Sequence, residues 1–212
     1  MVVTELALLR LRPGTTAQTP SLLVNLLKAK NVMEHASKSK FHYYHCVEDP
    51  EVIYIIGAWS SVRFHMDEFI PSQANQELLA LLKDQVSVEW MFHVDVDQDV
   101  RPLPLDAAAV LAIGRHIVKD NEKQIVQETF NENKLELDAF AGGTDKVVGG
   151  WRIDQGYDPG SEGVKDEFVL FTGWESVERH HAFATTEGFQ KYSKIRDRIE
   201  VVDIKHAIKL EV

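Results

Sequence analysis

The sequence has little of what most cofactor sites are built from. Cys46 is the only cysteine among 212 residues, so an internal disulfide and a thiolate cage for a metal are excluded. The histidine spacings HxH and HExxH are absent, and so are the GxGxxG and GK[ST] loops that hold nucleotides. We therefore expect no bound metal, flavin or nucleotide cofactor.

The charge and hydropathy patterns exclude further classes of partner. The formal net charge is −10, and no cluster of basic residues forms the positive face that nucleic acid requires. No apolar run approaches the ~20 residues that span a bilayer, and the N-terminus alternates apolar and polar residues rather than forming a leader. We expect a cytoplasmic protein with no nucleic-acid or membrane partner. With 44% hydrophobic residues, the chain can bury a sizeable core.

One unit is present twice. An apolar strand ends in tryptophan at Trp59 and again at Trp174, and a histidine follows six residues later, at His65 and His180. Both pairs are 115 residues apart. Because solenoid repeats have periods of ~20–50 residues, this longer repeat predicts two fused domains of one fold.

Each half predicts the element order βαββαβ with an extra helical turn. The Thr19-Pro20 pair is a helix start, and an apolar stripe follows it; Asp49-Pro50 predicts a hairpin turn. Pro102 and Pro104 mark a linker. We predict a first ferredoxin-like repeat at 1–96, a linker at 97–108 and a second repeat at 109–212, with a hairpin loop at Asp154–Lys165. The fold class is α+β, and the two antiparallel sheets are expected to pack into a pseudo-dimeric α/β barrel.

Two segments resemble a known family. TGWESVERHHAF at Thr172–Phe183 is similar to the strand end and helix start of antibiotic-biosynthesis-monooxygenase-like members of the dimeric α/β barrel superfamily. GAWSSVRFHMDEFIPSQANQ at Gly57–Gln76 resembles the version in fungal tandem proteins of this group. The resemblance implies a ligand pocket between each sheet and its helices. It leaves the chemistry open, because the superfamily includes cofactor-free monooxygenases, haem-degrading enzymes, cyclases, decarboxylases and members without known activity.

His65 and His180 are the first candidate catalytic residues. Each is expected in the first turn of a helix, where the helix dipole favours the neutral imidazole that a general base needs. Trp59 and Trp174 are candidate substrate-binding residues, because an indole at a strand end can form a flat wall for an aromatic ligand. Each of these side chains could instead be a packed core residue.

His206 is a third candidate catalytic residue. An offset of 114 residues between the last strands of the two halves matches Phe92 with His206, which leaves His206 isolated in an apolar row and His93 on the other face. Tyr44, Trp90 and His93 complete the predicted substrate-binding set. The polar and aromatic strand around Tyr44 favours the first half as the working one.

These features favour a cofactor-independent enzyme that acts on a hydrophobic aromatic or polyketide-like small molecule with a histidine general base. It could be a monooxygenase, or a cyclase or decarboxylase. Two alternatives stay open: a non-catalytic small-molecule-binding or stress-response protein of the same fold, and a haem-binding or haem-degrading protein. We expect a pseudo-dimeric monomer, with further homodimerisation left open.

Overall fold

The computed structural model describes residues 1–155 and 165–212, so most of the expected hairpin loop at Asp154–Lys165 lies outside the described residues. The chain divides into two compact units. The first contains Met1–Val100 together with Ile208–Val212, and the second contains Arg101–Ala207. The division after Val100 falls inside the segment 97–108 that the sequence suggested as a linker.

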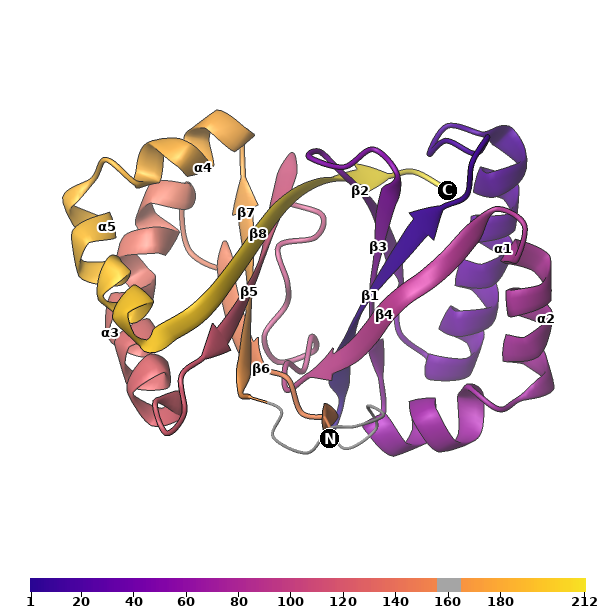
Figure 1. The fold of residues 1–212 in the computed structure, drawn as a ribbon, viewed down its shortest axis with the longest axis horizontal. Coiled ribbons are helices and arrows are strands. Elements are labelled where there is room, and N and C mark those ends of the chain that lie inside the picture. The colour runs from indigo at the N-terminus through magenta and orange to yellow at the C-terminus, as the bar shows by residue number, and fades with distance from the viewer. Residues whose placement is uncertain (156–164) are drawn as a thin grey trace. The chain divides into compact units, whose positions relative to one another are not determined.

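The first unit has an antiparallel sheet with the strand order β4-β1-β3-β2 and its helices on one face (Figure 1). Its elements are β1 (Val3–Leu11), α1 (Pro20–Ser37), β2 (His42–Cys46), β3 (Val52–Trp59), the π-helix η1 (Phe64–Phe69), α2 (Gln73–Leu82) and β4 (Val86–Val94).

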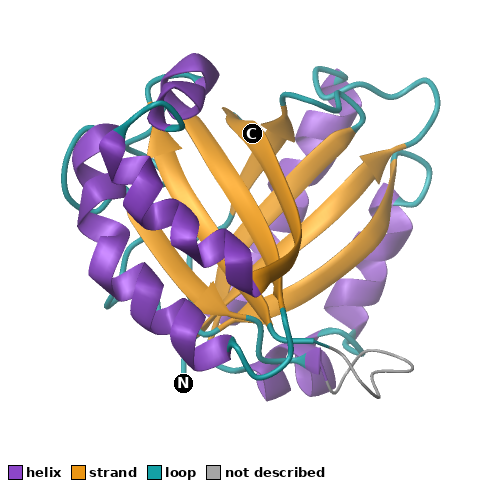
Figure 2. Ribbon diagram, turned by 60° about the vertical axis from the view of Figure 1, so that its left-hand side comes forward, coloured by secondary structure: helices purple, strands orange, loops and turns teal. Residues whose placement is uncertain are grey.

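The second unit has the strand order β8-β5-β7-β6, also antiparallel. Its elements are β5 (Val110–Val118), α3 (Lys123–Ala141), β6 (Val147–Trp151), β7 (Glu167–Trp174), α4 (Val177–Phe183), α5 (Glu187–Tyr192), the 3-10 helix η3 (Ser193–Arg198) and β8 (Ile199–Leu210). Figure 2 distinguishes its helices from its strands. The predicted mixed α+β fold is confirmed.

The first core forms between α1 and the sheet. The helix begins after Thr19 with Pro20 in its first turn, and its apolar stripe is buried as the sequence predicts, at Leu22, Leu26, Ala29 and Met33. These side chains pack with inward-facing residues of β1 and β3, among them Leu9 and Ile53. Leu210 and Val212, from the end of the chain, pack against the same core.

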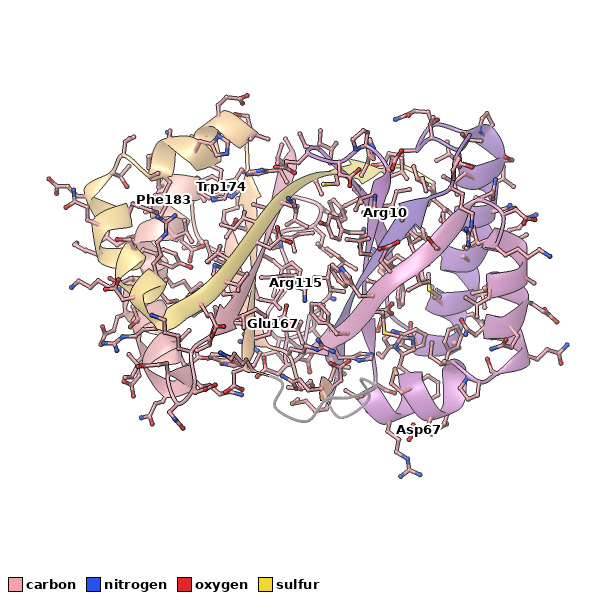
Figure 3. The ribbon with its side chains drawn as sticks, in the orientation of Figure 1. Arg10, Asp67, Arg115, Glu167, Trp174 and Phe183 are labelled. Carbon is pink, nitrogen blue, oxygen red and sulfur yellow. The ribbon has the colours of Figure 1, made fainter. Side chains whose placement is uncertain are left out.

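Buried ion pairs fix one part of the second sheet. Glu167 on β7 is almost completely buried and pairs with Arg115 on the neighbouring strand β5 (Figure 3). Arg152 lies 3.6 Å from the second oxygen of Glu167 and bonds Asp154 at 3.0 Å. A buried carboxylate requires such partners, because desolvation would otherwise raise its free energy.

Gly57 on β3 is required by close packing. A Cβ atom at this position would lie 2.2–2.5 Å from ring atoms of Phe41. We expect Gly57→Ala to lower the free energy of unfolding by about 1–3 kcal/mol, the usual cost of overpacking. Urea unfolding followed by tryptophan fluorescence measures this. The double variant with Phe41→Leu should recover part of the loss, whereas simple additivity of the two single effects would contradict the packing explanation.

Candidate functional site

A cavity of about 470 Å³ lies in the first unit, between the sheet and the segments α1, η1 and α2. Glu5, Ala7 and Leu9 line it from β1, because alternate residues of a strand point to the same face. Most of the remaining lining is apolar, with Met33, Tyr43, Ile55, Phe69, Leu78, Leu82, Val86 and Met91 among its residues. The volume and the apolar walls suit a small hydrophobic ligand.

In the part of the chain that the structure describes, Glu5 is the one carboxylate that lines the cavity, and it is 4% exposed. The indole Nε1 of Trp59 donates a hydrogen bond to its Oε2 at 2.5 Å. Trp59 comes from β3, which is paired directly with β1, so the sheet itself holds the indole beside the carboxylate. The buried acid therefore has a fixed hydrogen-bond donor on one side.

His65 lies on η1, next to this pair. Ser61 accepts a hydrogen bond from the backbone N–H of Phe64 and so starts the helical segment, as the sequence suggested. The imidazole is 2% exposed and stacks on Trp59, with ring centroids 4.1 Å apart and planes 10° from parallel. π-Helical turns are rare and occur often at functional sites.

Both ring nitrogens of His65 face polar groups. Nδ1 lies 2.7 Å from Nε2 of the fully buried His93 on β4, so one of the two donates a hydrogen bond to the other. Nε2 of His65 lies 3.9 Å from Oε2 of Glu5. Trp59, Glu5, His65 and His93 thus form one buried cluster, the Glu5–His65 cluster, at one end of the cavity.

Burial changes the acidity of both central groups. Desolvation, together with the neighbouring His93, lowers the pKa of His65 to about 3, so its imidazole is neutral at physiological pH. Desolvation also raises the pKa of Glu5, although the hydrogen bond from Trp59 and the electrostatic interaction with His93 act in the opposite direction. Glu5 is consequently a stronger proton acceptor than an ordinary carboxylate, and a neutral imidazole stands beside it.

The second unit contains a partial counterpart of this cluster. His180 stacks on Trp174, with centroids 4.5 Å apart, and its Nδ1 lies 2.8 Å from Nε2 of His206. Figure 3 shows Trp174 beside Phe183 of α4. The acid is missing, however. Ala112 takes the place of Glu5, and the indole of Trp174 donates to the hydroxyl of Thr172 at 2.7 Å instead.

The strand pairings correct the expected register of the last strands. His93 is paired with Glu5, and His206 is paired with Ala112, so His93 and His206 occupy matching positions, and the offset of 114 residues is wrong. The predicted strict alternation of residues along β4 is wrong, because its pairing with β1 shifts between Leu8 and Leu9. This shift leaves Glu89 as a bulge. His206 is therefore not isolated, since His180 is its partner.

None of the five predicted binding residues is among the lining residues of this cavity, although Trp59 and His93 bond to the lining residues Glu5 and His65. Tyr43 and its paired residue Ile55 line it, so Tyr44 points to the opposite face of the sheet. Trp90 is half-buried, packs on Phe92 with centroids 5.2 Å apart, and does not line the cavity. The sequence reasoning overlooked Glu5, although a carboxylate in the otherwise apolar row of Ala7, Leu9 and Leu11 was a usable signal.

The Glu5–His65 cluster does not fit a haem. A haem iron bound to Nε2 of His65 would need space beside this nitrogen, but Oε2 of Glu5 lies only 3.9 Å from it. The His65 ring also stacks on the indole of Trp59, which bonds Glu5, so the cluster as arranged leaves no room for a macrocycle. Within residues 1–155 and 165–212, no group of three or more His, Cys, Asp or Glu side chains is arranged to hold a metal ion.

The chain is similar in fold to several solved structures at very low sequence identity. A candidate monooxygenase from Lactobacillus acidophilus is 12% identical, with a TM-score of 0.65, and the match covers 99% of this chain and 94% of the other. An anthrone oxidase-like protein is 10% identical, with a TM-score of 0.58 and coverage of 99% and 92%. A haem-binding protein from Thermus thermophilus is 8% identical, with a TM-score of 0.61 and coverage of 100% and 92%.

These likenesses establish the ferredoxin-like class of fold and leave the activity open. No known protein family matches the sequence, and no curated protein matches it either. None of the helices in the described part of the chain is long and apolar enough to cross a membrane.

The lowered pKa of His65 predicts a pH-dependent loss of stability. Below pH 6.5 the unfolded chain binds a proton on this imidazole, whereas the folded chain stays neutral until about pH 3. The free energy of unfolding of the wild type should therefore fall relative to that of His65→Gln as the pH drops through this window. Urea unfolding at a series of pH values tests this, and parallel curves for the two proteins would contradict a buried neutral His65.

Proposed function

We propose that the protein is a cofactor-independent enzyme that removes a proton from a hydrophobic aromatic or polyketide-like small molecule. The observation that carries this proposal is the Glu5–His65 cluster at the end of an apolar cavity. The cluster is almost inaccessible to water and provides a base, and the apolar cavity next to it can hold an aromatic body, which are the three requirements for proton abstraction from a phenol or enol.

The gap between the two polar atoms suits a substrate hydroxyl. Nε2 of His65 and Oε2 of Glu5 are 3.9 Å apart, too far for a mutual hydrogen bond. A hydroxyl oxygen between them can lie ~2.8 Å from each, because two such distances reach up to about 5.6 Å. The hydroxyl would donate to one atom and be oriented by the other.

The proton balance assigns different roles to the two groups. Glu5 accepts the proton, since its raised pKa makes it the better base and Trp59 stabilises its ionised form. His65, neutral and held by His93, orients the hydroxyl and relays the proton when Glu5 is regenerated. This modifies the expectation from sequence, in which His65 was the base alone.

In the oxygenase version of this proposal, the electron-rich anion reduces dioxygen. One oxygen atom enters the substrate as a carbonyl and the other leaves as water, so a methylene that loses two hydrogens supplies all the electrons required. In the cyclase or decarboxylase version, the same anion closes a ring or loses carbon dioxide without dioxygen. The fold likeness to an anthrone oxidase-like protein makes anthrone, which carries such a methylene, the first probe to use.

The deciding experiment follows anthrone by absorbance together with dissolved oxygen. Anthraquinone formation with matching oxygen uptake supports the oxygenase version, and substrate loss without oxygen uptake supports the other. Binding that quenches tryptophan fluorescence without any turnover of a panel of phenols and anthrones would replace the enzyme with a binding protein.

Variants of the cluster provide the main mutational prediction. Glu5→Gln and His65→Ala should each lower kcat by about 10²- to 10⁴-fold, the usual loss when a general base is removed. His180→Ala is the matched control, because it removes the same contact with tryptophan and histidine in the unit that has alanine in place of the acid. It should leave kcat within a few-fold of the wild type. An equal loss in His180→Ala and none in His65→Ala would move the site to the second unit.

We propose that no haem is needed for this activity. Protein produced in haem-supplemented cells should show no Soret band at one haem per chain. A strong Soret band that is lost in His65→Ala would contradict both the steric argument on Trp59 and this proposal.

We further propose that the two units pack as a pseudo-dimeric α/β barrel, that the protein is a monomer acting in the cytoplasm, and that it binds neither membranes nor nucleic acid. The shared strand order of the two units supports the pseudo-dimeric packing. The buried free thiol of Cys46 supports a reducing compartment such as the cytoplasm. Light scattering and small-angle X-ray scattering test the assembly. A stable fold found only as a larger oligomer would count against the monomer.

A further inference from the structure

The cavity of the first unit has two chemically different ends. The strand β1 runs along it, with Glu5 near the start of the strand and Arg12 directly after its end. At ~3.3 Å per residue, the backbones at these positions are about 23 Å apart. The antiparallel pairing of β4 keeps this order, because His93 lies opposite Glu5 whereas Val86 lies opposite Leu11.

Two cations line the end away from Glu5. Arg12 donates from Nε to the backbone carbonyl of Lys83 at 2.9 Å, which joins the end of β1 to the end of α2. Both residues line the cavity and both are exposed to solvent, so they mark its open mouth. Glu5 is the only acid among the described residues that line the cavity, and it is at the other end.

The bond to Lys83 uses only one of the guanidinium nitrogens of Arg12. A guanidinium has five N–H donors, so Arg12 can still present a pair of donors to an oxyanion. Lys83 adds a second positive charge next to it. The two positive charges at this mouth contrast with the net charge of −10 of the whole chain.

From this arrangement we infer that the substrate is an elongated molecule with an apolar body. It carries an acidic hydroxyl or methylene at one end and a carboxylate or similar anionic group at the other. The anion binds Arg12 and Lys83 at the mouth, and the apolar body lies along Leu9, Leu82 and Met91. The reacting end thereby reaches Glu5 and His65. This inference rests on the proposed function and adds the substrate class to it.

The test compares two probes that differ only in this charge. One is a hydroxynaphthyl-octanoic acid, whose alkyl chain lets the carboxylate reach Arg12 and Lys83 while the hydroxyl lies at Glu5, and the other is its neutral methyl ester. Isothermal titration calorimetry should show that the wild type binds the acid about tenfold more tightly than the ester, with the preference falling as salt is added.

Lys83→Gln and Arg12→Gln should each reduce this preference, and the double variant should abolish it while the affinity for the ester stays unchanged. Lys28→Gln is the matched control, because it removes one exposed lysine of the same unit that does not line the cavity. Lys83→Gln retains the backbone carbonyl that Arg12 binds, so it tests the charge even if Arg12→Gln weakens the fold.

The outcomes separate this inference from the proposed function. Equal binding of acid and ester by the wild type, or binding of neither, overturns the anionic substrate. The function itself is judged by whether anthrone turnover depends on Glu5. Anthrone contains no anionic group, so its turnover needs neither Arg12 nor Lys83. An equal loss of preference in Lys28→Gln would show a general charge effect and also overturn the inference.

Discussion

A carboxylate buried as deeply as Glu5 costs several kcal/mol of free energy unless neighbouring groups stabilise it. Three features of the first unit meet this need. The pairing of β1 with β3 brings the indole N–H of Trp59 to Glu5, the pairing with β4 brings His93, and η1 places His65 between them. Stability alone would favour an apolar residue here, as Ala112 shows at the matching position of the second unit. An acid at this position therefore fits the proposed chemical role and not a stabilising one.

Comparison of the units shows which parts of the cluster are structural. The stacking of tryptophan on histidine and the bond between two histidines occur in both, so they belong to the way in which a helix is docked on the sheet. Among the described residues, only those of the first unit combine them with a buried acid and a π-helical turn. The bond from Trp174 to Thr172 shows how the same indole is satisfied without an acid. The two clusters thus differ by one substitution and a local change of helix type.

Much of the fold was predictable from the sequence, because it depends on local signals. Thr19-Pro20, the apolar stripe of α1 and the serines that start the helices after Trp59 and Trp174 all act over a few residues. The site was predictable only in part. His65 and Trp59 follow from the repeat, but the partnership of His65 with His93 depends on strand register, and the bulge at Glu89 reverses the face of β4 without a sequence signal. Glu5 was missed because its partner Trp59 is distant in sequence and is recognised only once β1 and β3 are paired.

The first unit is not continuous along the chain, since Ile208–Val212 belongs to it and Leu210 and Val212 pack on its core. During synthesis these residues leave the ribosome only after the whole second unit has been made. An N-terminal domain usually folds while the rest of the chain is still being translated. Here the nascent first unit would keep part of its apolar core uncovered until Ile208–Val212 has been made. Its final packing is therefore a late step that follows the synthesis of the second unit.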